Sequence, residues 1–138
     1  MFVQGAIPGH ILQESANTGS EEPGAIAVFI GKVRGDVIEG KRVASIEFTA
    51  QQLIAEKVAG TILEESKKQF GISTAEIWHS LGKVKTGEAC FYVRVVGKHR
   101  EESFHALPYI VNEVKRRCPV FGREIFSDGD YQWKENKI

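Results

Sequence analysis

The chain has 138 residues, 42% of them hydrophobic, and its 18 Lys and Arg residues are balanced by 18 Asp and Glu residues, for a formal net charge of zero. This length fits one domain with one core, so residues 1–138 are expected to form a single domain. A neutral chain lacks the positive excess with which proteins hold nucleic acids or anionic membranes, so neither is an expected partner.

The first part of the chain predicts two strands separated by exposed loops. Residues 13–24 are polar and Gly-rich and are expected to form a mobile surface loop. Residues 25–33, "AIAVFIGKV", form an apolar, β-branched run that predicts a strand covered on both faces and central in its sheet. Residues 34–42 carry two glycines and five charges, so a second mobile loop is expected before the alternating strand "VASIEFTA".

A long helix is predicted over residues 51–70. Its apolar residues Ile54, Val58 and Ile62 recur every four positions, as on one face of a helix. Thr49 and Gln52 have the spacing of a capping box, and Gly71 supplies a C-terminal stop.

The second half predicts a hairpin, a helix and another hairpin. "AEIWHSLGKV" and "ACFYVRVVGK" are strand-like and joined by the turn-forming "KTGE". A helix should follow "GKHREES" and end before Pro119. Pro108 within it means either that the regular helix begins shortly before this proline or that the helix is kinked there. "SDGD" predicts a turn between the last two strands.

Strands and helices in the order β, β, α, β, β, α, β, β predict an α+β domain with a mainly antiparallel sheet and two main helices. Such a fold does not by itself define a function, so the function has to come from the residues that it places together.

The segment "VKRRCPVFGRE" gathers positive charge at the end of the second helix. Lys115, Arg116 and Arg117 lie in its last turn, where each cation stabilises the helix dipole by about 0.3 to 1 kcal/mol. Arg123 follows the proline break and brings further charge as the chain folds back. Two interpretations stay open here, a helix-dipole role and an anion-binding pocket.

Three other basic residues follow predicted strands. His99 and Arg100 precede the second helix, where backbone N–H groups favour anions, although a solvated loop is the alternative. Arg34 follows the apolar strand at residues 25–33, where a site residue and an ion pair to a neighbouring acid are both reasonable.

Metal, nucleotide and redox chemistry have little support. Cys90 and Cys118 lack the paired spacing of a zinc site and are too few for a disulfide scaffold, and the histidines show no ligand spacing. Neither GxGxxG nor GxxxxGK[ST] occurs, and no apolar run approaches the roughly 20 residues that cross a bilayer. We therefore expect a cytoplasmic protein with reduced thiols, no metal and no cofactor.

Three segments, "GAIAVFIGKVRG", "GKHREESFHALPYIVNEVKRRCPVFGREI" and "YQWKEN", resemble the large, catalytic subunit of molybdopterin synthase. The resemblance covers nearly the whole chain from Gly24 onward and rests on the order and spacing of these segments. It implies an α/β hammerhead fold with an added antiparallel β subdomain. It also implies a homodimer at the centre of a heterotetramer, in which each pocket borrows residues from the other large subunit.

The same resemblance implies an activity. The family inserts two sulfurs into cyclic pyranopterin monophosphate, forming the dithiolene that later binds molybdenum. The sulfur arrives as a thiocarboxylate on the C-terminal Gly-Gly tail of a small ubiquitin-like carrier. Lys115 matches the catalytic lysine, which would stabilise negative charge or transfer a proton in acyl transfer. The implied substrate-binding residues are Phe29 on the pocket wall, Arg34, the phosphate-binding His99 and Arg100 from across the dimer, and the additional cations Arg116 and Arg123.

One position departs from the family. Most members read aromatic-Lys-basic-Glu after the proline, but this chain reads "FGRE", so Gly122 replaces a second functional lysine. Arg123 offers a neighbouring charge, but a guanidinium does not serve as a base at neutral pH. The alternative is therefore a weakened family member that binds the carrier tail without efficient conversion. An unrelated RNA-binding module is disfavoured because the chain lacks a basic excess.

Overall fold

The computed structural model describes residues 1–135 and confirms the α+β class with a mainly antiparallel sheet. In chain order the elements are β1 (Phe2–Gln4), α1 (Gly9–Gln13), β2 (Ala25–Lys32), β3 (Val37–Ile38), β4 (Lys41–Ala50), α2 (Gln52–Phe70), β5 (Thr74–Lys85), β6 (Ala89–Gly97), α3 (Arg100–Arg117), β7 (Val120–Phe126) and β8 (Tyr131–Trp133). The short elements β1, α1 and β3 are absent from the sequence-based prediction.

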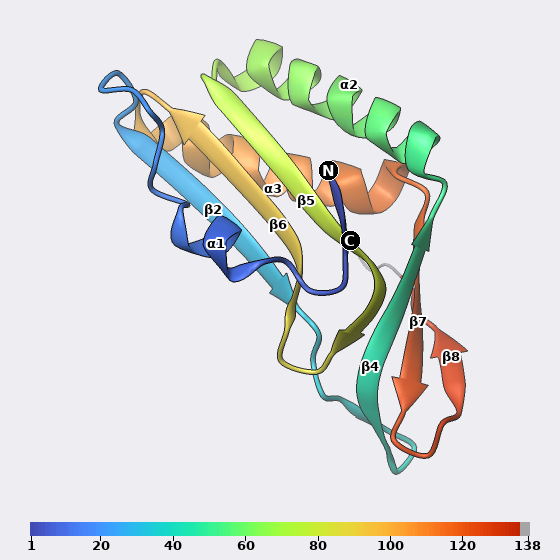
Figure 1. The fold of residues 1–138 in the computed structure, drawn as a ribbon. Helices are drawn as coiled ribbons and strands as arrows, with labels where there is room; N and C mark the ends of the chain where they lie inside the picture. Colours follow the sequence, from blue (N-terminus) through green and yellow to red (C-terminus); the bar gives the residue numbers. More distant parts are fainter. Residues whose placement is uncertain (136–138) are drawn as a thin grey trace.

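The strands form one twisted sheet in the order β2-β6-β5-β4-β7-β8, with β3 on β4 and β1 parallel to β5 (Figure 1). β2 therefore lies at an edge, and the prediction of a central strand covered on both faces was wrong. Its Ile26 and Ile30 are 36% and 44% exposed. An apolar run also suits an edge strand that packs on one face only, and sequence alone does not separate the two cases.

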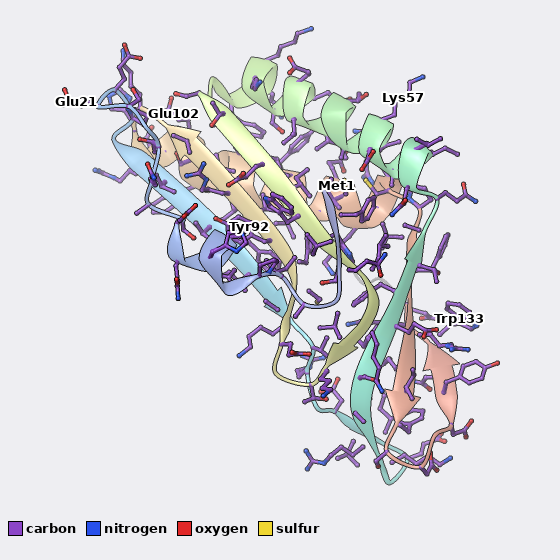
Figure 2. All side chains as sticks on the ribbon, viewed as in Figure 1. Met1, Glu21, Lys57, Tyr92, Glu102 and Trp133 are labelled. Carbon is purple, nitrogen blue, oxygen red and sulfur yellow. The ribbon has the colours of Figure 1, made fainter. Side chains whose placement is uncertain are left out.

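Two layers cover the sheet. The long helices α2 and α3 lie side by side on one face, while the short α1 crosses the other (Figure 1). The main core lies under α2 and α3 and includes the fully buried Ile62, Val93 and Ile110. A smaller core under α1 includes Tyr92 (Figure 2), whose hydroxyl donates to Ser15 Oγ at 3.1 Å.

α2 matches its predicted range but begins differently. Its N-cap is Gln51, which makes no side-chain cap, so the predicted capping box at Thr49 and Gln52 was wrong. Thr49 instead belongs to β4, where it pairs with Phe121 of β7. At the other end Gly71 has φ 72° and its N–H donates to the Lys67 carbonyl at 3.0 Å, which confirms the predicted stop.

α3 begins at Arg100 and contains Pro108 within its length. The helix therefore starts well before the proline, which cannot donate a hydrogen bond to the preceding turn. The Glu102 carboxylate accepts the His99 backbone N–H at 2.6 Å and caps the start. Cys118 is already extended ahead of Pro119, so the predicted end is confirmed.

The two segments predicted as mobile loops contain regular contacts. In residues 34–42, β3 and β4 form a small hairpin whose turn has positive φ at Glu39 and Gly40. In residues 13–24, the carbonyls of Ser15 and Asn17 accept bonds from the Arg94 guanidinium. Their mobility stays a prediction. The β5–β6 and β7–β8 hairpins are confirmed.

Candidate active site

A cavity of about 390 Å³ opens where the end of α3 meets β2, β6 and β7. Among residues 1–135, no carboxylate lines this cavity, and five cationic side chains do, namely Lys32, Lys115, Arg116, Arg117 and Lys134. Its aromatic wall consists of Phe29, Phe48, Phe91 and Phe121 together with His79. A space that combines apolar rings with positive charge suits a flat or extended ligand that carries a negative group.

Lys115 lines this cavity from the last turn of α3. Its helix position follows the buried Val114, and its Nζ lies 5.8 Å from the centre of the Phe91 ring. Burial lowers the pKa of Lys115 below its usual value, and the positive charge of Lys134 lowers it further, while Cys90 acts in the opposite direction. A partly desolvated ammonium acts strongly on nearby negative charge because little water screens it.

The aromatic wall is held by edge-to-face contacts. Phe29 and Phe91 meet at 5.5 Å with an interplanar angle of 73°, and Phe48 meets His79 at 5.0 Å and 83°. His79 Nδ1 lies 2.8 Å from the Ser80 carbonyl oxygen, and burial lowers the pKa of His79 to about 4. His79 is therefore a neutral residue of the cavity wall at neutral pH.

A second cavity of about 520 Å³ adjoins the first, because Lys115 and Lys134 line both. Arg34 lines this second cavity, and its Nε lies 2.8 Å from Asp36 Oδ1. The Arg34 side chain is 83% exposed. The ion pair considered from the sequence is present, and the guanidinium still borders a space that Lys115 shares.

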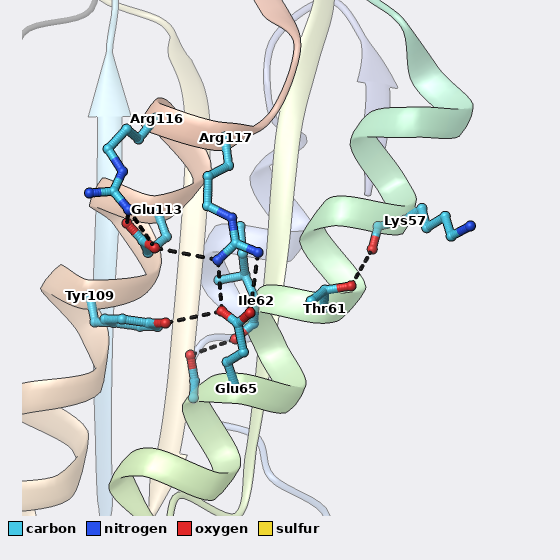
Figure 3. Close-up of polar contacts among 9 residues, drawn as sticks. Lys57, Thr61, Ile62, Glu65, Tyr109, Glu113, Arg116 and Arg117 are labelled. Carbon is cyan, nitrogen blue, oxygen red and sulfur yellow. Dashed lines mark hydrogen bonds and ion pairs between the residues drawn. The ribbon is translucent and has the colours of Figure 1, made fainter.

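Two of the clustered arginines face carboxylates (Figure 3). Arg117 forms a bidentate ion pair with Glu65 of α2, at 2.7 and 3.2 Å, and the Tyr109 hydroxyl donates to the same carboxylate at 3.0 Å. Arg116 pairs with Glu113 at 3.0 Å. Arg117 thus joins α3 to α2, while Arg116 borders the first cavity from an exposed position.

Gly122 and Arg123 lie on opposite faces of β7. Gly122 lines the first cavity, whereas Arg123 pairs with Glu47 at 2.7 Å and lies 4.5 Å above the Tyr131 ring. Successive side chains in a strand point to opposite faces, so Arg123 does not take the place of a lysine at position 122.

His99 and Arg100 lie at the opposite end of α3 from Lys115. They line a separate hollow of about 560 Å³ with Gly24, Lys98 and Glu101. At 1.5 Å per residue, Arg100 and Lys115 are roughly 22 Å apart along the helix. One chain therefore does not bring these predicted site residues together with Lys115.

The cysteines and the other sequence expectations add no further chemistry. Burial raises the pKa of both Cys90 and Cys118, so both stay as thiols at neutral pH. Within residues 1–135, no group of three or more His, Cys, Asp or Glu side chains is arranged to hold a metal ion. In the same residues, no helix has the length and apolar character needed to cross a membrane.

Two further cations, Lys134 and Lys32, have no role in the sequence-based prediction, although Lys134 lies in the segment "YQWKEN" that carries the family resemblance. Lys134 follows β8, and its backbone N–H donates to the Gly122 carbonyl at 2.8 Å, which places it beside Lys115. The turn signal "SDGD" predicted the hairpin, but only the strand register shows that residue 134 returns to position 122. Lys32 reaches the cavity from the end of β2.

Together these features define a class of protein: an α+β domain with a cavity lined by cations and aromatic rings, Lys115 among them, at the end of its long helix α3. The sequence matches the family model described as "MoaE protein" over residues 8–117. It is 37% identical to the molybdopterin synthase catalytic subunit of Pyrococcus abyssi over 126 residues, which cover 91% of this chain and 84% of that protein. The chain belongs to the MoaE family, the catalytic subunits of molybdopterin synthase in molybdenum cofactor biosynthesis.

Other relatives agree with this assignment. The chain is 35% identical to the molybdopterin synthase catalytic subunit of Oryza sativa subsp. indica, covering 83% of this chain but only 58% of that longer protein. The crystal structure of molybdopterin synthase from Staphylococcus aureus has a TM-score of 0.86 at 25% identity and covers 98% of this chain and 96% of that one. A complex of molybdopterin-converting factor subunits 1 and 2 from Helicobacter pylori shares the fold, with a TM-score of 0.82 at 19% identity over 99% of this chain and 90% of that one.

Proposed function

We propose that this chain transfers sulfur from the C-terminal thiocarboxylate of a small ubiquitin-like carrier to cyclic pyranopterin monophosphate, forming the molybdopterin dithiolene. Family membership supports the reaction, and the cavity around Lys115 supports the location. The carrier is anionic at its terminal thiocarboxylate, and the pterin is anionic at its phosphate. A site with many cations and apolar walls suits such ligands.

The observation that carries this proposal is the position of Lys115. Its ammonium is partly buried in a cavity lined by further cations and by aromatic rings, and its pKa is lowered by burial and by Lys134. In acyl transfer the carrier's terminal carbonyl oxygen gains negative charge, which a fixed cation stabilises. The lowered pKa also makes proton transfer by Lys115 easier near neutral pH.

The remaining predicted residues surround two spaces. Phe29 borders the first cavity and Arg34 the second, and Lys115 borders both, so a carrier tail and a pterin have room to lie next to each other. His99 and Arg100 are too far along α3 to reach the same ligand within one chain. We assign them to the site of a second copy in a homodimer, where they bind the substrate phosphate.

The carrier is the expected partner. The Helicobacter pylori structure is described as a complex of subunits 1 and 2 of molybdopterin-converting factor, and its subunit fold matches this chain. By that likeness, a small subunit would place its Gly-Gly tail in the cavity of Lys115. Two carriers on a homodimer give the heterotetramer implied by the sequence.

The direct test is single-turnover conversion of cyclic pyranopterin monophosphate by the protein mixed with thiocarboxylated carrier. Wild type should form the dithiolene, and Lys115→Ala should lose about 10²-fold or more in rate, because one preorganised charge contact is removed. A Lys115→Ala protein that converts the precursor at the wild-type rate would remove the central role given to this residue.

A second candidate function, carrier binding with little conversion, is favoured by Gly122. No side chain from this position enters the cavity, and a Cβ there would lie 3.2 Å from both Ile46 Cγ2 and Phe48 Cε1. A lysine at 122 therefore requires a small shift of these two neighbours.

Gly122→Lys separates the two candidates in the same single-turnover assay. Similar rates for wild type and Gly122→Lys indicate that the present residues suffice for sulfur transfer. Conversion that begins only with lysine at position 122, while wild type binds the carrier tightly, indicates a binding protein.

A further inference from the structure

We propose that Lys134 is a second substrate-binding cation of this site, which holds the anionic group of a substrate where the two cavities meet. This inference rests on the proposed function and gives a role to a residue that has none in the sequence-based prediction. Lys134 lines both cavities, and Lys115 is its partner in doing so.

The backbone fixes the position of Lys134. Trp133 pairs with Arg123 in the β7–β8 ladder, and the next N–H, that of Lys134, donates to the Gly122 carbonyl at 2.8 Å. Gly122 has no side chain of its own, so β7 places only backbone at this point of the cavity wall. The Lys134 side chain thus enters the site beside a residue that leaves the space open.

The charge of Lys134 is available to a ligand. Within residues 1–135, no carboxylate lies within salt-bridge distance of its ammonium, while Arg34, Arg117 and Arg123 are each paired with an acid. An unpaired cation on a cavity wall binds an oxyanion without first breaking an internal ion pair, which favours binding.

The two lysines act on each other. Burial lowers the pKa of Lys115 most, and the positive charge of Lys134 lowers it further, so the two ammonium groups, which line the same two cavities, act on each other. Two ammonium groups that face the same space repel each other, and an anion between them removes this repulsion. The pair is therefore arranged to bind negative charge jointly.

Two ligand groups have the required chemistry, the carboxylate or thiocarboxylate of the carrier tail and the phosphate of the pterin. Both are oxyanions that accept hydrogen bonds from an ammonium. Titration calorimetry with separate probes distinguishes them. The probes are a synthetic peptide ending in Gly-Gly with a free carboxylate, the same peptide with a C-terminal amide, and cyclic pyranopterin monophosphate.

The variants are Lys134→Gln, Lys134→Arg and the control Lys57→Gln. A side-chain change keeps the Lys134 backbone bond to Gly122, and Lys57 points outward from α2, away from both cavities (Figure 2). Lys134→Gln should bind the free-carboxylate peptide or the pterin about tenfold more weakly than wild type does. The affinity of Lys134→Arg for the same probe should stay within about threefold of the wild-type value. The amidated peptide and Lys57→Gln should show no such loss.

The outcomes separate this inference from the proposed function when conversion is measured in parallel. Equal binding of both anionic probes by Lys134→Gln and wild type overturns the inference, as does an equal loss for the free and amidated peptides. If wild type then still converts the precursor, the proposed function stands alone. A selective loss for an anionic probe without any conversion by wild type supports the Lys134 site and rejects the sulfur transfer. Wild type that binds none of the probes overturns both.

Discussion

At the scale of single residues, the site depends on a lysine that is costly to bury. Because burial lowers the pKa of Lys115 in the folded chain, the unfolded chain binds more protons between this lowered pKa and the usual value of 10.5. Stability therefore rises with pH through this window, and below it the full cost of the buried charge is present. A residue kept at such a cost is expected to serve the reaction.

Lys115→Met tests this trade between stability and activity. Methionine keeps much of the side-chain volume and removes the charge. The unfolding free energy of wild type in urea, minus that of Lys115→Met, should therefore increase from pH 7 to pH 10.5. Activity should fall about 10²-fold. A stability difference between the two proteins that is constant over this pH range would show that Lys115 has no lowered pKa.

His79 predicts a different pH dependence. Its pKa is lowered from 6.5 to about 4 by burial, so below pH 6.5 the unfolded chain takes up a proton that the folded chain does not. Stability from this residue is complete above pH 6.5 and is lost as the pH falls towards 4, by up to roughly 3 kcal/mol. Urea unfolding at pH 7 and 4.5 should show this loss in wild type and a smaller one in His79→Gln. The same loss in both proteins would place the titration elsewhere.

At the scale of elements, the contact between α2 and α3 has a polar component. Glu65 accepts two hydrogen bonds from Arg117 and one from Tyr109 (Figure 3). Both partners lower the pKa of Glu65, and the bonds from Arg117 have the larger effect. Bidentate geometry makes this pair more effective than an ordinary surface pair. Part of the basic cluster thus holds the helices together, as the structural interpretation of the sequence allowed.

A double-mutant cycle measures this contribution. The variants Glu65→Gln and Arg117→Gln should show a favourable coupling that decreases with added salt. The control cycle uses Glu64 and Lys67 on the exposed side of α2, a single contact of 3.3 Å. We expect a smaller coupling there, because only one exposed pair is broken. Equal couplings in the two cycles would show that the bidentate geometry adds nothing.

Local patterns predicted the long elements well and the short or edge elements poorly. α2 and α3 have strong periodicity and clear stops at Gly71 and Pro119, and the structure follows both. β1 and α1 have three and five residues, too few for a periodic signal. The edge position of β2 depends on which strand pairs with it, which is a long-range property.

Local sequence patterns have the same limit in predicting the candidate site. Lys115, Phe29 and Gly122 were singled out from the sequence and line one cavity. Strand alternation after Pro119 puts Arg123 on the face of β7 opposite Gly122, so this feature follows from the sequence once residues 120–126 are known to form a strand. Lys134 belongs to the segment "YQWKEN" that carries the family resemblance, but its place beside Lys115 follows from the β7–β8 register and from the bond to Gly122.

At the scale of the whole molecule, the basic residues gather at two distant ends of α3. Lys115 lies at one end with two cavities, and His99 and Arg100 lie at the other with a third, roughly 22 Å away. If all of them act on one substrate, two chains must be arranged so that the start of α3 in one approaches the end of α3 in the other.

Mixing two inactive variants tests this arrangement. Lys115→Ala and Arg100→Ala homodimers should each be inactive, but a heterodimer has one site with Lys115 from one chain and Arg100 from the other, both intact. Random exchange makes half of the dimers heterodimers with one active site of two, so the mixture should recover about a quarter of wild-type activity. Recovery should require subunit exchange, which unfolding and refolding the variants together provides and mixing them at low temperature does not. A refolded mixture that stays inactive, although size-exclusion chromatography shows dimers, would reject a site that combines Lys115 of one chain with Arg100 of the other.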